Sequence, residues 1–65
     1  MVRIRRYEDP LPCLVLHDDG QWHRGQLNCW VRQADGNWRA HVSYTVAPGN
    51  TFLRSVPATM LRRLQ

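Results

Sequence analysis

Residues 38–46 alternate without interruption between two kinds of side chain, and this pattern constrains the fold more than any other. A period of two places successive side chains on opposite faces of a strand, so the segment predicts a β-strand with one buried face. We place Trp38 in the core on that face, and the ring of Tyr44 at the rim of the core. The buried set is Trp38, Ala40, Val42, Tyr44 and Val46, and the opposite set is Arg39, His41, Ser43 and Thr45.

Turn signals divide the rest of the chain into short runs of strand-forming residues. Residues 18–20 (Asp-Asp-Gly) follow one run, and Asp35-Gly36 is a strong hairpin signal between the next two. Pro57 lacks a donor N–H, so it ends the fourth run. The predicted strands cover residues 13–17, 22–33, 38–46 and 51–56, and they are followed by one helical or 3₁₀ turn and a short closing strand.

The length of 65 residues leaves room for one domain with a small core, since such a chain buries only about 60% of the surface that its unfolded form exposes. Four or five short antiparallel strands bury a common core by curling into a small barrel, which also hides most strand edges. We therefore predict an all-β fold, a five-stranded antiparallel SH3-like barrel over residues 11–65 with a short 3₁₀ turn near the C-terminus. Residues 1–10 are expected to form a flexible, basic N-terminal arm.

The composition excludes several classes of protein. Hydrophobic residues make up 43% and charged residues 22% of the chain, which argues against intrinsic disorder. No apolar run approaches the about 18 residues of a membrane-spanning helix, and the charged N-terminus leads into no apolar segment of signal-peptide type. All nine basic residues are arginine, and the net charge is +4. We expect a small basic bacterial protein of the cytoplasm that has no membrane partner.

Neither the cysteines nor the other reactive side chains form a recognisable catalytic or metal-binding motif. A disulfide between Cys13 and Cys29 is one alternative, but two reduced, buried thiols are the expectation, because small secreted scaffolds carry more cysteines at denser spacing. A zinc site would need His17, His23 or His41 as further ligands, and no pair of these residues stands at metal-ligand spacing. We expect no enzyme activity, no metal and no cofactor.

Several short pieces of the sequence follow one another in a characteristic order. The pieces are Asp19-Gly20-Gln21-Trp22-His23-Arg24-Gly25, Asp35-Gly36, Val42-Ser43-Tyr44, Gly49-Asn50, Val56-Pro57 and Leu61-Arg62. In the order of these pieces the chain resembles a Tudor domain over residues 14–63, and the resemblance implies a small barrel that binds a partner. Tudor domains that bind methylated lysine or arginine do so with an aromatic cage, which attracts a cation to the faces of its rings.

The resemblance also implies site residues. Position by position, two of the family's cage aromatics fall near Leu16 and on Ala47 or Pro48, where this chain has no aromatic residue. A histidine stands where the family has the tyrosine of its Trp-Tyr pair, while a later tyrosine and an asparagine match the pattern. Phe52 is placed to substitute for the missing wall of the second loop. The set implied for a degenerate cage or peptide groove is His23, Tyr44, Asn50 and Phe52.

A second candidate surface comes from the alternation within residues 22–33. It divides them into a polar and aromatic face, Trp22, Arg24, Gln26, Asn28, Trp30 and Arg32, and a core face, His23, Gly25, Leu27, Cys29 and Val31. Indoles stack, guanidiniums carry charge and amides bind base edges, so the first face predicts nucleic-acid binding. With two residues of the next strand, the predicted binding set is Arg24, Trp30, Arg32, Arg39 and His41.

Three functions are compatible with these patterns. The first is a small non-enzymatic interaction module that binds nucleic acid. The alternative is a Tudor-like module for a protein or peptide, or a subunit of a larger assembly or homo-oligomer that buries Trp30. An oligomeric enzyme is the third.

Three substitutions test the predicted placement of side chains. Truncation of Trp30 is expected to leave the stability of the domain nearly unchanged, and truncation of Trp38 is expected to unfold it. Gly25 is expected to tolerate alanine but no bulky side chain.

Overall fold

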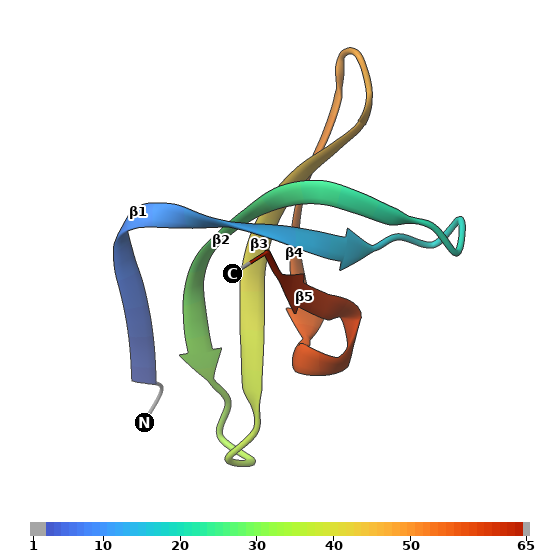
Figure 1. Cartoon of the computed structure of the whole chain (residues 1–65). Coiled ribbons are helices and arrows are strands. Elements are labelled where there is room, and N and C mark those ends of the chain that lie inside the picture. Colours follow the sequence, from blue (N-terminus) through green and yellow to red (C-terminus); the bar gives the residue numbers. More distant parts are fainter. Residues whose placement is uncertain (1–2, 65) are drawn as a thin grey trace.

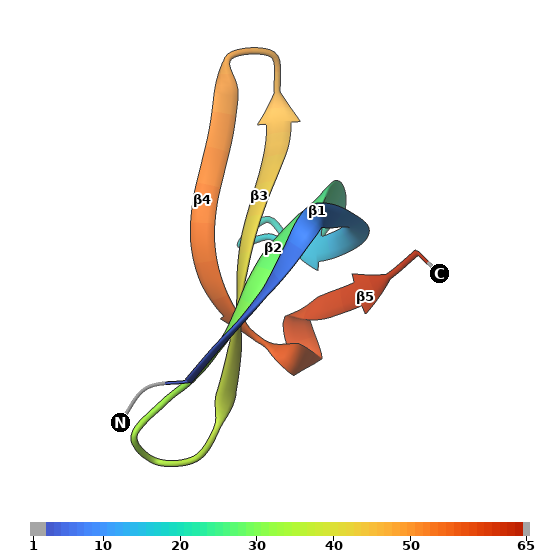
Figure 2. The ribbon, with the colours of Figure 1, turned by 90° about the vertical axis from the view of Figure 1, so that its left-hand side faces the viewer.

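A computed structural model describes residues 3–64, which form one antiparallel sheet of five strands. The elements are β1 (Arg3–Leu16), β2 (Trp22–Arg32), β3 (Trp38–Ala47), β4 (Asn50–Pro57), the 3₁₀ turn η1 (Ala58–Met60) and β5 (Leu61–Arg63). The strand order across the sheet is β4-β3-β2-β1-β5, and the sheet curls into a half-barrel whose two edges are β4 and β5 (Figures 1 and 2). The predicted all-β fold of five antiparallel strands with one 3₁₀ turn is confirmed.

The turns between strands lie where the sequence signals predict them. Residues 33–37 join β2 to β3, and residues 48–49 join β3 to β4. Gly36 and Gly49 have φ angles of 90° and 84°, which a residue with a Cβ atom rarely adopts. Strands β2, β3 and β4 therefore match the predicted boundaries to within a single residue.

Strand β1 differs from the prediction because it begins at Arg3 and not at Cys13. Its first half pairs with the second half of β2. Residues 3–10, expected as a flexible arm, thus form a strand, since the long β2 would otherwise leave its backbone hydrogen-bonding groups unpaired along one edge. Residues 1 and 2 of the predicted arm and residue 65 of the predicted barrel lie outside the described residues.

The sheet bends at Asn28, where β2 holds one residue more than the facing stretch of β3. Leu27 pairs with Val42 and Cys29 pairs with His41, so Asn28 between them forms a β-bulge. Strand β1 shifts its register against β2 at the same level. A bulge moves the side chains that follow it to the opposite face of the strand. The strict alternation predicted for residues 22–33 is therefore wrong beyond this bulge.

One face of the sheet, which we call the inner face, carries the hydrophobic core, and the other is the outer face. Leu27 and Trp30 both belong to the inner face, although they are three positions apart, because the bulge lies between them. Tyr44, predicted at the rim, is only 2% exposed. The buried core cluster is Cys13, Val15, Leu27, Ala40, Val42, Tyr44 and Val56.

Two of the tryptophans do not occupy the places predicted for them. Trp30 pairs with Ala40, packs half-buried against the core cluster and donates a hydrogen bond from Nε1 to the Tyr7 hydroxyl at 3.2 Å. Trp38 is half-buried opposite Arg32 at the start of β3 and lies outside the core cluster. Both predictions are wrong because the bulge reverses the faces of β2 and because the core ends before the β2–β3 turn.

The two cysteines are free thiols, and both are buried, as predicted. Cys13 belongs to the core cluster, and its burial raises the pKa of the thiol. Cys29 is buried on the outer face, where it pairs with His41. The two thiols are therefore on opposite sides of the sheet, and each acts as a small apolar side chain.

Gly25 lies where the backbone of β2 closely approaches that of β3. A Cβ atom at this position would lie 2.6 Å from Cβ of Tyr44 and would press on the backbone oxygen of Ser43. Neither contact can be relieved by rotating a flexible side chain. The expectation that Gly25 tolerates alanine is therefore contradicted, while the close backbone approach behind it is confirmed.

Candidate functional site

Four aromatic rings meet on the inner face beside the β1–β2 turn, and we call them the aromatic cluster. Its members are His17, His23, Tyr44 and Phe52. Tyr44 and Phe52 pair across β3 and β4 with ring centroids 5.6 Å apart, and His23 of β2 lies 6.3 Å from the Tyr44 ring. The ring of His17, from the turn, lies 4.9 to 5.6 Å from the other three. Three strands and one turn thus contribute to a single cluster.

The Tyr44 hydroxyl ties the aromatic cluster to Arg54 and Asp18. Nη1 of Arg54 donates to this hydroxyl at 3.1 Å and to Oδ1 of Asp18 at 3.2 Å. The hydroxyl also lies 2.7 Å from Nδ1 of His17. Both acceptors raise the pKa of the Arg54 guanidinium, the hydroxyl more than the carboxylate. These hydrogen bonds hold the end of the Tyr44 side chain in one place.

Asp19 holds the turn that carries His17. Its Oδ1 accepts a hydrogen bond from the backbone N–H of Gln21 at 2.9 Å, and its Oδ2 lies 2.9 Å from Nε2 of His23. The backbone hydrogen bond is the main cause of the lowered pKa of the Asp19 carboxyl, and the bond to His23 adds to it. The carboxylate therefore positions His23 within the aromatic cluster.

The surroundings of the aromatic cluster favour a cation over an anion. Asp18 and Asp19 flank it, and Arg54 offsets one of these two charges. The Asp18 side chain is 74% exposed and Phe52 is 37% exposed. A cation from a partner can therefore reach both a carboxylate and an aromatic ring, where an exposed cation–π contact contributes about 0.5–1 kcal/mol. A phosphate would meet the two carboxylates instead.

The cage set predicted from the resemblance is assembled in part. The aromatic cluster contains His23, Tyr44 and Phe52 of that set. Asn50 lies apart, paired with Ala47 beside the β3–β4 turn. The prediction missed His17, although the resemblance placed the first cage aromatic near Leu16, one residue earlier. The aromatic ring observed at this place, that of His17, therefore stands one residue after the predicted cage position near Leu16.

The set predicted for nucleic-acid binding is divided between the two faces. Trp30 and Arg32 follow the bulge and belong to the inner side of the sheet. Arg24, Arg39 and His41 belong to the outer face, but the bend at the bulge separates Arg24 from the other two. The continuous basic stripe expected from strict alternation therefore does not form.

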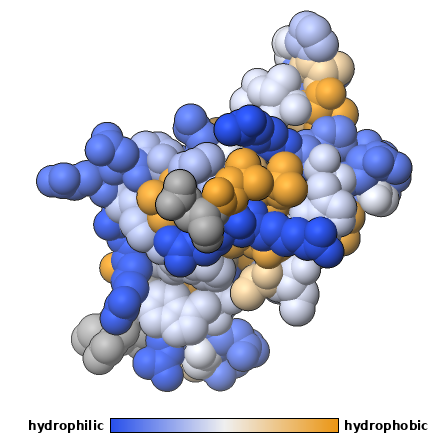
Figure 3. Space-filling model, viewed as in Figure 1, coloured by the Kyte–Doolittle hydropathy of each residue, from blue (hydrophilic) through white to orange (hydrophobic). Residues whose placement is uncertain are grey.

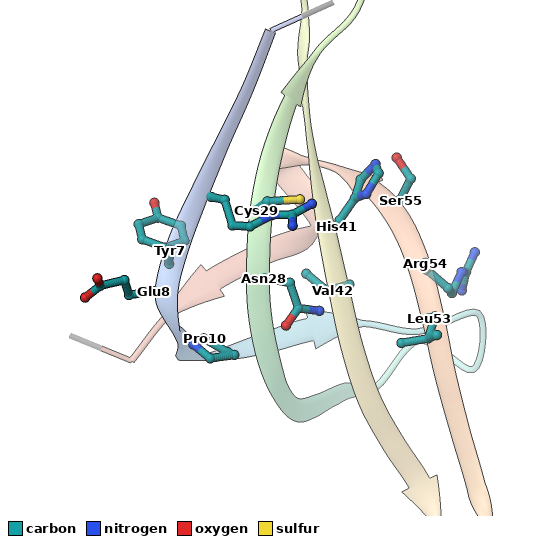
Figure 4. A pocket seen from close by; sticks show the side chains of 11 residues that line it. Tyr7, Glu8, Pro10, Asn28, Cys29, His41, Val42, Leu53, Arg54 and Ser55 are labelled. Carbon is teal, nitrogen blue, oxygen red and sulfur yellow. The ribbon is translucent and has the colours of Figure 1, made fainter.

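A groove of about 560 Å³ crosses the outer face at the bend. Figure 4 shows His41 and Ser55 on one side of this groove and Tyr7 and Glu8 on the other. Arg6 and Glu8 both line it, so their opposite charges lie in the same groove. His41, from the predicted set, is exposed here. Arg54 also lines the groove, so its lining carries charges of both signs.

Among residues 3–64, no three His, Cys, Asp or Glu side chains come together in a way that could hold a metal ion. Within the same residues, no helix has the length and apolar character needed to cross a membrane. Comparisons of the chain with protein-family models, with curated proteins and with solved structures find no match.

Proposed function

We propose that this chain is a non-enzymatic, Tudor-like interaction module that binds a protein segment through a lysine or arginine side chain, methylated or unmodified. The observation that carries the proposal is the meeting of four rings from β2, β3, β4 and the β1–β2 turn beside two carboxylates. The five-stranded antiparallel half-barrel agrees with the fold that the sequence resemblance implies. The aromatic cluster also includes most of the residues that the resemblance assigns to a cage.

Phe52 and Asp18 are the groups that a partner can reach. The Phe52 ring is stacked on the buried ring of Tyr44, so it presents a supported aromatic surface. The exposed Asp18 carboxylate accepts one hydrogen bond from Arg54, and its other lone pairs are available to a second donor. A cationic side chain thus gains a cation–π contact and a charge-assisted hydrogen bond at the same place.

Peptides that differ in a single side chain test this proposal. A fluorescent peptide carries lysine, trimethyllysine, arginine, dimethylarginine or neutral norleucine at its centre, and binding is followed by fluorescence anisotropy. We expect at least one of the cationic peptides to bind about 5- to 30-fold more tightly than the norleucine peptide, which corresponds to about 1–2 kcal/mol. Equal binding of all five peptides would refute the proposal.

Phe52→Ala and Leu53→Ala form a matched pair of variants for the same assay. Leu53 neighbours Phe52 in β4 but faces outward, where it is 80% exposed. Phe52→Ala should remove the preference for the cationic peptide, because the accessible ring is lost. Leu53→Ala should keep that preference. A preference that survives in Phe52→Ala would show that the cation binds elsewhere.

A further inference from the structure

The outer face of β1, β2 and β5 carries a second surface, on the other side of the sheet from the aromatic cluster. Arg62, Leu14 and Arg24 form one row across these three strands. We call this surface the outer patch, and its residues are Leu14, Leu16, Trp22, Arg24, Gln26 and Arg62. In Figure 3 an apolar area over the second half of β1 is bordered by strongly hydrophilic side chains over β2 and β5. The outer patch therefore combines an apolar centre with a charged border.

The two arginines of the outer patch are available to a ligand. The Arg62 guanidinium lies over the Trp22 ring, 4.3 Å from its centroid. Stacking of this kind orients the guanidinium plane and leaves its N–H donors free at the edge. The ion pairs among the side chains of residues 4–64 are His23 with Asp19 and Arg54 with Asp18. Within that part of the chain, both Arg24 and Arg62 thus lack a carboxylate partner.

The two acidic side chains nearest to Trp22 in the sequence bind groups of the inner face. Asp18 and Asp19 stand next to Trp22 in the sequence, but they bind Arg54 and His23, whose side chains belong to the inner face. The outer patch contains two guanidiniums and no carboxylate, in a chain of net charge +4. Charge complementarity therefore favours a polyanion on this surface.

We propose that the outer patch binds single-stranded nucleic acid. Arg24 and Arg62 would contact phosphates, and the Gln26 amide can bind a base edge. The stacked Arg62 and the apolar centre around Leu14 would contact base faces, which a single strand exposes and a duplex hides. This surface is independent of the peptide site, and it differs from the predicted nucleic-acid set because Trp22 takes the place of Trp30.

Salt-dependent binding of an oligonucleotide tests the proposal. A short fluorescent single-stranded oligonucleotide of mixed sequence is titrated with the protein. Two phosphate contacts predict a slope of about −1.4 in log affinity against log salt, which is a loss of about sevenfold between about 50 mM and about 200 mM salt. A duplex of the same sequence is expected to bind more weakly, and equal binding of the duplex would overturn the single-strand assignment.

Three variants with the same change of net charge locate the contacts. Arg24→Gln and Arg62→Gln should each weaken binding about tenfold at the lower salt, because each removes a charge-assisted contact. Each should also reduce the salt slope by about half. Arg39→Gln is the control, since Arg39 lies beyond the bend and donates to Oγ of Ser55 at 3.1 Å. It should bind like the wild type.

Several results would overturn the assignment. One is a failure of the wild type to bind the oligonucleotide at the lower salt. Another is an equal loss of affinity in Arg39→Gln, which would show that binding depends on the net charge of the protein and not on the outer patch. A third is binding of an acidic peptide in place of the oligonucleotide, with loss in Arg62→Gln, which would identify a protein partner instead. Phe52→Ala should leave oligonucleotide binding unchanged, so failure of the peptide site and failure of the outer patch are distinguishable.

Discussion

The Tyr44 hydroxyl lies 2.7 Å from Nδ1 of His17, which precedes it by 27 positions in the chain. Arg54 donates to the same hydroxyl at 3.1 Å, and an arginine side chain has no acceptor to offer in return. The hydroxyl has one hydrogen and two acceptor lone pairs, so it binds Arg54 and Nδ1 of His17 at the same time, and the tautomer of His17 decides which of the two donates. This bond ties the β1–β2 turn to β3 and holds the His17 ring against the rest of the aromatic cluster.

Tyr44→Phe removes this hydroxyl and keeps the ring. We expect the free energy of unfolding to fall by about 1–2 kcal/mol, because His17 and Arg54 both lose a hydrogen-bond partner. Urea denaturation measures the change. In NMR spectra of the variant, the ring-nitrogen signals of His17 should shift, because Nδ1 loses its hydrogen-bond partner. Unchanged stability together with unchanged His17 signals would show that the hydrogen bond does not form in solution.

Gly25→Ala tests the close approach of β2 and β3. The added Cβ atom would press on the backbone of β3 at Ser43, and overpacking of this kind costs about 1–3 kcal/mol. Gln26→Ala is a control at the next residue, on the exposed outer face, where we expect a change within about 0.5 kcal/mol. Equal urea midpoints for the two variants would mean that the strands can separate without cost.

The strands and turns were largely predictable because their signals are local. The alternation of residues 38–46 and the hairpin signal at Asp35-Gly36 each act over a few residues, and both identify β3 and its boundaries. The pairing of residues 3–10 with β2 is not local, and the sequence of these residues shows no alternation that would predict a strand. The bulge at Asn28 could not be predicted either, because β2 has one residue too many only in comparison with the facing stretch of β3. A strict period of two therefore assigned Trp30 to the wrong face.

Trp30→Ala and Trp38→Ala should differ in stability in the opposite sense to the sequence-based expectation. Trp30 packs against the core cluster and donates a hydrogen bond to Tyr7, so its truncation should cost about 2–4 kcal/mol. Trp38 lies outside the core cluster, and we expect about half that cost or less. Urea denaturation of both variants measures the order. A larger loss of unfolding free energy for Trp38→Ala than for Trp30→Ala would show that Trp38 belongs to the core.

Acidification should loosen the β1–β2 turn through Asp19. The folded state lowers the pKa of this carboxyl, so its contribution to stability is complete above the pKa of the unfolded chain and is lost as the pH falls through the folded value. The melting temperature of the wild type should therefore fall below about pH 4. Asp19→Asn, which keeps an oxygen acceptor for Gln21 but cannot titrate, should show a shallower fall. If the melting temperatures of the wild type and Asp19→Asn fall in parallel with pH, protonation of Asp19 is not the cause of the fall.

The candidate site was predictable only as far as the resemblance extended. His23, Tyr44 and Phe52 stand at positions with a counterpart in the Tudor pattern, and they do meet. Arg54 has no such signal, because it occupies an inner-face position of β4 where alternation predicts an apolar residue. Its partner Asp18 is 36 positions away, and both reach the Tyr44 hydroxyl or its neighbours only in the folded chain. Such long-range polar contacts leave no local pattern.

Deletion of Asn28 tests whether the β-bulge sets the faces of β2. Without this residue, either Trp30 leaves the inner face or the pairing of β2 with β3 slips by one residue. Either change exposes apolar surface that the small core needs, and a domain of this size has only about 3–5 kcal/mol of stability to lose. We therefore expect the deletion variant to lose its cooperative thermal unfolding transition, measured by circular dichroism.

Asn28→Ala is the matched control, because it changes the side chain and keeps the residue count. No non-glycine residue among residues 3–64 has a positive φ angle, so alanine can adopt the bulge conformation without strain. We expect this variant to differ from the wild type by less than about 1 kcal/mol. If the deletion variant instead unfolds cooperatively near the wild-type temperature, then β2 accepts strict alternation, and the bulge is not what places Trp30 against the core.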